Sequence, residues 1–335
     1  MTLLHEAPRA IAPRELLARF AIGDGIELGP GHHPFPLPFP GTRVRYADRW
    51  APEQNRDLFP ELGREASFPK PDIILNLDTD RMSPIADMSQ DFIVASHILE
   101  HMADPLGLLA EIYRTLRPGG VAIIFLPDRR RTFDQRRSPT PLAHLIEDHA
   151  QRATTVSDEH LEDFLRNTDT WEPSWDGDSE LRRRAYELHR QRSIHVHCWS
   201  QDEFIEVLEH SVTRMDMSWE LLDASFVEET PDGFEFGYAL RRSTVFRGRQ
   251  VMADRLHATW TALAERAARP ATTPQAVGDH EVEQWRVRAL NAEGRLARIH
   301  AVPGYPVAVK LWRAYLDVRR RLDTLRPSGN GRRPT

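Results

Sequence analysis

Apolar residues fall into short runs separated by stretches of helical periodicity, a pattern typical of parallel strands joined by helices. The run from Asp72 to Leu77 is mostly apolar, as expected of a strand buried on both faces. Two further runs flank the turn sequence Pro231-Asp232-Gly233, which predicts a hairpin. The expected strands lie near residues 25–29, 43–48, 72–77, 91–97, 121–126, 214–227 and 234–241. The pattern therefore predicts an α/β chain with a Rossmann-like, doubly wound, mostly parallel sheet.

The segments outside this pattern are helical in character. Residues 128–199 are too long for a simple connection between two elements. Because they follow the fifth expected strand, we predict that they cover the carboxyl edge of the sheet as a substrate lid. We expect a first domain over residues 1–245 and a helical extension over 246–335, with a basic, partly disordered end.

A glycine-rich turn follows the first expected strand. Gly29 and Gly31 are separated by one residue, which lets the backbone approach a ligand closely. Glu27 precedes them and is expected to organise the turn and to meet a charged group of the ligand. Asp48 ends the second expected strand, about twenty residues further on, where an acid accepts hydrogen bonds from a ribose. The spacing predicts a site for an adenosine-containing cofactor.

The residues after this turn distinguish between cofactors. A dinucleotide site requires a third glycine and a helix whose N-terminus holds the pyrophosphate. Here Pro34 takes the place of that glycine, and prolines follow at positions 36, 38 and 40. Such a segment cannot continue a regular helix. We therefore expect a cofactor without phosphate, and S-adenosyl-L-methionine fits this description.

Four motifs support this expectation by resemblance. They occur in the order Glu27-Leu28-Gly29-Pro30-Gly31, Asp48, Leu99-Glu100-His101 and Leu116-Arg117-Pro118-Gly119-Gly120. In this order and spacing, residues 13–242 resemble a class I S-adenosylmethionine-dependent methyltransferase of the small-molecule or glycan type. Two features depart from that family: His33 stands where a third glycine is common, and the proline-rich segment replaces the first helix.

The resemblance also implies positions for the rest of the cofactor. Leu77 and Asp78 follow the third expected strand, where the family holds adenine, and Asp80 is an alternative to Asp78. Ser96 and His97 end the fourth expected strand, where the resemblance places the methionine half of the cofactor. The sheet is expected to end in the antiparallel hairpin of that family.

Three histidines are candidates for the base that a methyl acceptor would need. His101 lies one helical turn after His97, and His195 and His197 lie in the segment that ends at Trp199. If that segment is extended, these two histidines and Trp199 share one face. The two histidines have no acid close in sequence, which is a weak signal for a metal, so we predict none. A purely structural role for all three histidines stays open.

Composition limits the expected cellular compartment and the classes of binding partner. The chain has 335 residues and a net charge of −6, and its one cysteine, Cys198, permits no internal disulfide. Neither a signal peptide nor a transmembrane run is evident, so we expect a cytoplasmic protein. Residues 301–335 hold eight basic and two acidic residues, whereas the rest is acidic. A general nucleic-acid binder would place its basic face on the main domain, so we expect no nucleic-acid partner.

These observations predict an enzyme that transfers a methyl group to a hydroxyl of a sugar or secondary metabolite. The run Arg129-Arg130-Arg131 could bind a phosphate or carboxylate on such a substrate, or pair with acidic residues. Nitrogen methylation stays open, as do a non-catalytic binding protein of the same fold and, less favoured, an NAD-dependent oxidoreductase. The helical extension is a candidate surface for a homodimer.

Overall fold

The computed structural model describes residues 12–37, 42–62, 67–168, 170–227 and 233–268. The strands are β1 (Asp24–Leu28), β2 (Arg43–Asp48), β3 (Ile73–Ile74), β4 (Gln90–Ser96), β5 (Leu116–Pro127), β6 (Trp219–Ser225) and β7 (Glu235–Arg242). The helices are α1 (Pro13–Ala18), α2 (Pro52–Leu58), α3 (Pro105–Thr115), α4 (Leu142–Gln151), α5 (Asp158–Asn167), α6 (Ser174–Gly177), α7 (Ser179–Arg192), α8 (Gln201–Arg214) and α9 (Arg249–Ala268). Short 3-10 turns are η1 (Pro60–Leu62), η2 (Leu99–His101), η3 (Arg129–Arg131) and η4 (Phe133–Arg136).

The strands form one sheet in the order β3-β2-β1-β4-β5-β7-β6. The first five are parallel, and β7 pairs antiparallel with both β5 and β6. This confirms the predicted doubly wound sheet that ends in an antiparallel hairpin. The chain runs outward from β1 to β3 and then returns to β4 on the other side of β1. In open α/β sheets, ligands bind at such a reversal, beyond the carboxyl ends of the strands.

The two faces of the sheet have separate cores. In β4, Phe92 and Val94 pack in the core that includes α1, while Ile93 and Ala95 pack with α3 and α8. All four are buried, as the alternation of side chains along a strand between two covered faces requires. Burial of both faces keeps the strand ends at the site in fixed positions.

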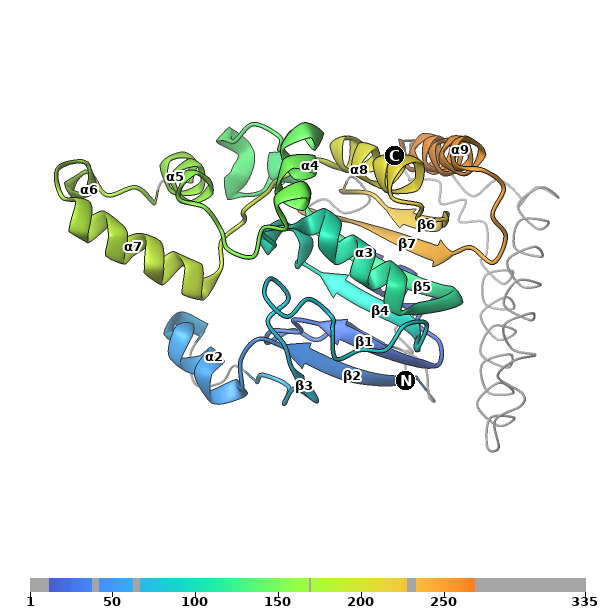
Figure 1. Ribbon diagram of the computed structural model, residues 1–335, viewed down its shortest axis with the longest axis horizontal. Helices are drawn as coiled ribbons and strands as arrows, with labels where there is room; N and C mark the ends of the chain where they lie inside the picture. Colours follow the sequence, from blue (N-terminus) through green and yellow to red (C-terminus); the bar gives the residue numbers. More distant parts are fainter. Residues whose placement is uncertain (1–11, 38–41, 63–66, 169, 228–232, 269–335) are drawn as a thin grey trace, which may run out of the picture. The chain divides into compact units, whose positions relative to one another are not determined.

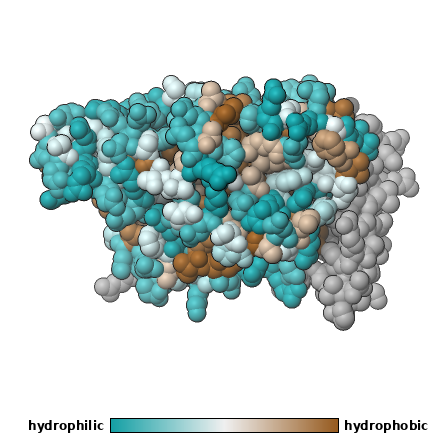
Figure 2. Space-filling view, viewed as in Figure 1, coloured by the Kyte–Doolittle hydropathy of each residue, from teal (hydrophilic) through white to brown (hydrophobic). Residues whose placement is uncertain are grey.

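Residues 128–199 leave the sheet and return to it at almost the same place. Asp128 forms a bridge with Trp199, and the N–H of Arg129 donates to the carbonyl of Trp199 at 2.9 Å. Between them lie η3, η4 and α4 to α7, and Figure 1 shows α5, α6 and α7 beyond the arrowhead ends of the parallel strands. The hydrophilic colouring of this end in Figure 2 agrees with helices whose outer faces meet solvent.

Three strands differ clearly from their predicted extent. The sixth was expected over 214–227, but α8 continues to Arg214 and β6 covers Trp219–Ser225. The third was expected as a buried strand over 72–77, but β3 has two residues and lies at the sheet edge, with Ile74 61% exposed. The chain turns away because the N–H of Asn76 donates to the Asp80 carboxylate and that of Asp80 to the Asn76 carbonyl. The fifth strand begins at Leu116, earlier than expected, because the Arg-Pro-Gly-Gly motif belongs to β5.

The end of the described chain is helical. Helix α9 packs against α8 and β6, and its buried residues Met252 and Leu256 belong to the main core. The rest of the predicted extension, from 269 onward, lies outside the described residues, so the boundary at 245 stays a prediction. Of the helices that the structure describes, none has the length and apolar character to cross a membrane.

Candidate functional site

The glycine turn after β1 has the backbone that its sequence requires. Gly29 and Gly31 have φ values of +54° and +56°, in the left-handed region that favours glycine. A Cβ on Gly29 would lie 2.4 Å from Cδ1 of Ile98, whereas one on Gly31 would meet no atom within 4 Å. Residues 29–37 contain no helix, as the prolines predict. The turn therefore offers open backbone at Gly31 and no helix N-terminus to hold a pyrophosphate.

Glu27 lies beneath this turn and is buried. Its Oε1 accepts from the N–H of Phe35 at 2.8 Å, while Oε2 is buried without a hydrogen-bond partner among the described residues. Burial raises the pKa of Glu27 to about 7, although the Phe35 N–H and the charge of Arg14 act in the other direction. A cationic ligand group beside Oε2 would compensate this carboxylate.

The two aspartates predicted to hold the adenosine half follow neighbouring strands. Oδ1 of Asp48, at the end of β2, accepts from the N–H of Trp50 at 3.3 Å. Burial raises the pKa of Asp48, and the bond from Trp50 partly offsets this effect. Oδ1 of Asp78 accepts from the N–H of Ala103 at 2.9 Å, so this residue also ties the β3 loop to the start of α3. Leu77, partly buried, packs against the main core.

His97, next to Ser96 at the end of β4, lies in a chain of charged groups. Its Nε2 is 2.7 Å from Oε2 of Glu235, and its Nδ1 is 3.3 Å from Oε1 of the fully buried Glu100. Arg14 of α1 donates twice to the same Glu235 carboxylate, at 2.8 and 2.6 Å. Burial alone would lower the pKa of His97, but the two carboxylates outweigh it and raise the pKa to about 9. His97 is therefore protonated at neutral pH.

His101 and His195 meet beyond the end of β4. Their ring centroids are 4.9 Å apart, and Nδ1 of His101 is 2.7 Å from the carbonyl oxygen of Ile194. Nδ1 of His195 is 2.6 Å from Oδ2 of the buried Asp134. Donation from Nδ1 to this carboxylate leaves Nε2 of His195 as a proton acceptor, the arrangement of an oriented general base. Burial lowers the pKa of His101 to about 4, so that ring is neutral at neutral pH.

The expectation that His195 shares one face with His197 and Trp199 is wrong. The segment is not a regular strand, and its two histidines point into different clusters. His197 is fully buried, stacks on Trp199 with ring centroids 5.7 Å apart, and lies with His144 and His160 instead of His101. Burial lowers the pKa of His197 well below its usual value.

The arginine run after β5 is engaged in ion pairs. Arg129 donates to both oxygens of Glu203 at 3.0 and 2.8 Å, and Arg130 donates to Asp128 at 2.6 Å. Glu203 also accepts from the N–H of Ser200 and thereby caps α8. These pairs favour a structural role for the first two arginines of the run.

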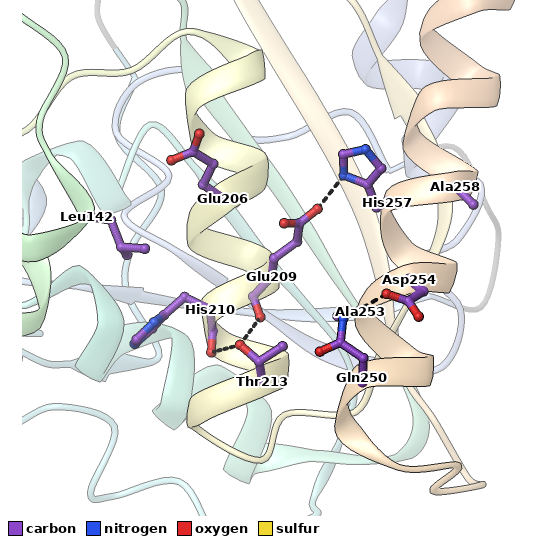
Figure 3. Close-up of a pocket in the computed structure, with 10 residues that line it drawn as sticks. All are labelled: Leu142, Glu206, Glu209, His210, Thr213, Gln250, Ala253, Asp254, His257 and Ala258. Carbon is purple, nitrogen blue, oxygen red and sulfur yellow. Dashed lines mark hydrogen bonds and ion pairs between the residues drawn. The ribbon is translucent and has the colours of Figure 1, made fainter.

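A groove of about 480 Å³ lies between α8 and α9, away from the glycine turn and the histidines described above. Figure 3 shows its lining, which includes Glu206, Glu209, His210 and His257, with His257 paired to Glu209. It contains none of the residues predicted to bind cofactor or substrate. Helix α9 packs against both α8 and β6, and β6 is at the end of the sheet opposite to β3.

Comparison with known proteins finds a family similarity in part of the chain. Residues 50–124 match the family model described as a methyltransferase domain. The matched segment contains α2, β3, β4, α3 and most of β5. The end of β4, with Ser96 and the following His97, therefore lies inside the matched segment.

A curated relative from Mycolicibacterium smegmatis is named a probable S-adenosylmethionine-dependent methyltransferase. It is 34% identical over 73 residues, which are 22% of this chain and 28% of the relative. The match thus spans less than a third of the relative's length. It is therefore a similarity of part of the chain and carries no conclusion about the whole protein.

Solved structures share the general arrangement at low identity. A methyltransferase from Thermotoga maritima is 14% identical, with 68% of this chain and 92% of that chain covered and a TM-score of 0.35. The 1,6-didemethyltoxoflavin-N1-methyltransferase of Burkholderia thailandensis is 14% identical, with 70% of this chain and 79% of that chain covered and a TM-score of 0.38. A protein from Rhodobacter sphaeroides, named among Zn-dependent alcohol dehydrogenases, is 12% identical, with 68% of this chain and 88% of that chain covered and a TM-score of 0.40. Since these scores are low and the names differ, they carry no argument about activity.

Several residues of this region were not predicted. Asp134 contacts His195 from 61 residues away, and Glu235 of β7 contacts His97 and accepts in turn from Arg14 of α1. No local spacing connects these partners. A buried acid that pairs with a histidine so far along the chain is recognised only once the fold brings the two together.

Proposed function

We propose that the protein is an S-adenosylmethionine-dependent methyltransferase that methylates a hydroxyl of a sugar or secondary metabolite. The observation that carries the proposal is the turn after β1. It pairs left-handed glycines with a buried, half-satisfied carboxylate and continues without a helix. Such a turn suits an ammonium and a ribose and offers no dipole to a pyrophosphate.

The residues at the strand ends fit the three parts of the cofactor. Glu27 would meet the ammonium group, Asp48 the ribose hydroxyls, and Asp78 the adenine amine through the oxygen that does not bind Ala103. The bound cofactor would supply a methyl group on a sulfonium. The chain's own contribution is then to hold the acceptor in line and to take its proton; positioning contributes on the order of 7–11 kcal/mol in favourable cases.

His195 is the base that the geometry favours among the three predicted histidines. Its Asp134 contact fixes the ring, whereas His197 is fully buried in another cluster. The side chain of Phe133 is 52% exposed and its ring centroid is 4.6 Å from that of His195, so it offers an apolar surface for a sugar ring or an aromatic acceptor. We assign His101, beside His195, to positioning of the acceptor or of that base.

The insertion 128–199 would act as the substrate lid. Besides Phe133 and His195, it brings the guanidinium of Arg192 to 5.3 Å from the Phe59 ring, which follows α2. This contact connects the insertion to the C-terminal end of α2, the helix that follows β2 and Asp48 along the chain. An acceptor between the lid and the sheet would be shielded from water on that side.

The cofactor assignment is tested by titration calorimetry with S-adenosylhomocysteine and, separately, with NAD. We expect binding of the first only. Asp48→Ala should weaken it by about 1.5–3 kcal/mol, the range for hydrogen bonds to a charged group. Asp57→Ala, an exposed acid on α2, is the matched control and should leave affinity unchanged. Binding of NAD without S-adenosylhomocysteine would overturn the assignment.

The acceptor is tested with methyl-labelled cofactor and panels of hydroxylated sugars and metabolites, with amines included for comparison. His195→Ala and Asp134→Asn should lower kcat for the best hydroxyl acceptor by about 10²–10⁴-fold, while cofactor affinity stays within about twofold. Transfer to amines alone would contradict hydroxyl methylation. Tight cofactor binding without transfer to any acceptor would favour a non-catalytic binding protein.

A further inference from the structure

Four potential metal ligands gather inside the insertion, away from the pair His101 and His195. His144 and Asp148 lie one turn apart on the same face of α4, and His160 lies in the first turn of α5. His197 comes from the segment between α7 and α8. Three separate elements therefore direct imidazole or carboxylate groups toward one point.

The ligand atoms are as close as a bound cation requires. Nε2 of His144 is 2.7 Å from Nε2 of His160 and 3.3 Å from Oδ2 of Asp148. The same oxygen is 3.9 Å from Nε2 of His160 and 3.8 Å from Nε2 of His197, and all four groups offer atoms within 4.8 Å of one another. In tetrahedral zinc sites the metal–nitrogen distance is about 2.0–2.1 Å, which separates neighbouring ligand atoms by roughly 3.3 Å. The observed distances bracket that value.

The hydrogen bonding of the cluster is incomplete. His197 has no exposed side-chain surface, and neither of its ring nitrogens makes a hydrogen bond of good geometry among the described residues. Oδ2 of Asp148 is likewise buried and has no hydrogen-bond partner there. Buried polar groups without partners are costly, and a buried carboxylate oxygen is more so. A cation at the centre would satisfy one ring nitrogen of His197 and Oδ2 of Asp148 together, and the backbone of Met102 contacts the same ring.

We propose that His144, Asp148, His160 and His197 bind a zinc ion. Three imidazoles and one carboxylate are borderline ligands that suit zinc, and four protein ligands leave no open position. The site is therefore structural: it joins α4, α5 and the segment that returns to β5. Ser157 supplies the outer contact typical of such sites, with its Oγ 2.8 Å from Nδ1 of His160.

The second cluster of possible ligands, Glu100, His101 and His195, does not meet the same criteria. There, only three groups converge, and both histidines belong to the region proposed to hold the methyl acceptor. The side chain of His144, by contrast, is 38% exposed, which gives a metal a route into the buried part of the first cluster.

The test is elemental analysis of the full-length protein, purified without chelator from cells grown with added zinc. We expect about one zinc per chain, and removal of zinc by pyridine-2,6-dicarboxylate should lower Tm reversibly. His144→Gln and Asp148→Asn should lower the zinc content at least about tenfold. His189→Gln, on α7 in the same insertion, should keep it. Far-UV circular dichroism and S-adenosylhomocysteine affinity would show that the variants are folded.

Cobalt gives a second readout. Cobalt(II) added to the zinc-free protein should produce the strong visible absorption of a tetrahedral site, and zinc should abolish it. Protein that contains no zinc, takes up neither metal and has the same Tm before and after chelation would overturn the proposal. Full zinc occupancy in the His144→Gln variant would overturn it equally. Neither result depends on methyl transfer or on cofactor binding.

Discussion

The sheet and the insertion are stabilised by different kinds of interaction. The sheet has apolar side chains on both faces, in two cores whose buried residues come from every strand except β3. The insertion has a separate core with five buried apolar residues, Leu161, Leu165, Tyr186, Ile194 and Val196. A core of this size stabilises little by itself. The insertion therefore also depends on its buried polar groups and on Leu145 and Trp199, which pack in the main core. This difference explains how the same groups can hold the segment together and present His195 to a substrate.

The polar framework of the insertion centres on Arg137, whose side chain is 2% exposed. It donates to Asp134 at 2.8 Å, to Asp163 of α5 at 2.8 Å and to the carbonyl of His195 at 2.7 Å. One guanidinium thus connects η4, α5 and the segment that carries the predicted base. The sheet has no need of such a connection, since burial of its apolar faces already fixes the strands.

The largest expected effect is a loss of apolar packing in the sheet. Phe92→Ala removes a fully buried ring from β4, against which Gly25 of β1 lies too close to carry a side chain. We expect the free energy of unfolding to fall by about 3–5 kcal/mol and the whole chain to unfold earlier in urea. Leu161→Ala, in the insertion core, is the comparison. It should increase protease cleavage within 128–199 while the sheet keeps its circular dichroism; a global transition in both variants would remove the distinction.

Removal of the buried Arg137 guanidinium from the insertion should have the next largest effect on stability. Arg137→Met leaves Asp134 buried beside His195 alone, and breaking a buried ion pair costs about 3–5 kcal/mol. We expect the lower end of that range, since His195 still contacts the carboxylate. Limited proteolysis should show cleavage confined to the insertion, and S-adenosylhomocysteine affinity should persist. The double variant Arg137→Met with Asp134→Leu should recover part of the loss; no recovery would show that the pair itself is not the cause.

The difference between apolar packing in the sheet and polar contacts in the insertion also explains which features can be predicted from the sequence. Each central strand carries its own evidence, because a strand buried on both faces is a short apolar run and its helix follows at a typical distance. The glycine turn and Asp48 belong to a local spacing as well. The short β3 was not predictable, because the Asn76 and Asp80 turn competes with the strand and leaves Ile74 at the sheet edge.

The insertion shows the limit of such reasoning. His195 and His197 are two residues apart and invite a common role, yet they belong to different clusters. Their partners Asp134 and His144 are more than 50 residues earlier in the chain, at distances that no periodicity connects. Only the return of the chain from Asp128 to Trp199 brings them together. Polar sites built from distant segments therefore required the fold.

A smaller expected effect is the dependence of stability on pH that arises from His97 and Glu235, at the end of the sheet beside the site. The carboxylates of Glu100 and Glu235 raise the pKa of His97 to about 9, above its ordinary value of 6.5. This contribution to stability is complete below 6.5 and is lost as the pH rises through about 9. Burial alone would raise the pKa of Glu235, but the contacts with His97 and Arg14 lower it to about 2. The contribution of Glu235 to stability is therefore complete above pH 4.5 and is lost as the pH falls through about 2.

His97→Asn tests this contribution. His97 has a φ of +55°, a conformation that Asn tolerates well, so the variant removes the charge with little backbone strain. We expect urea unfolding of the parent protein to show lower stability at pH 9.5 than at pH 6, and this decrease to be smaller in the variant. An equal decrease in both proteins would show that other groups cause it.

The smallest expected effect is the release of at most one proton from Glu27 when the cofactor binds. It separates a role of Glu27 in cofactor binding from a role in the folded structure alone. Burial raises the pKa of Glu27 to about 7, so the free protein holds most of one proton there at pH 6. If the cofactor's ammonium pairs with Oε2, the carboxylate must ionise as S-adenosylhomocysteine binds, and the proton leaves. Calorimetry at pH 6 in buffers with different heats of ionisation should therefore show proton release, which should fall to near zero at pH 8.5. Glu27→Gln should abolish the release and weaken binding, whereas Glu53→Gln, an exposed acid on α2, should change neither. Identical heats in all buffers at pH 6 would separate Glu27 from the ammonium and leave it a structural acid beneath the glycine turn.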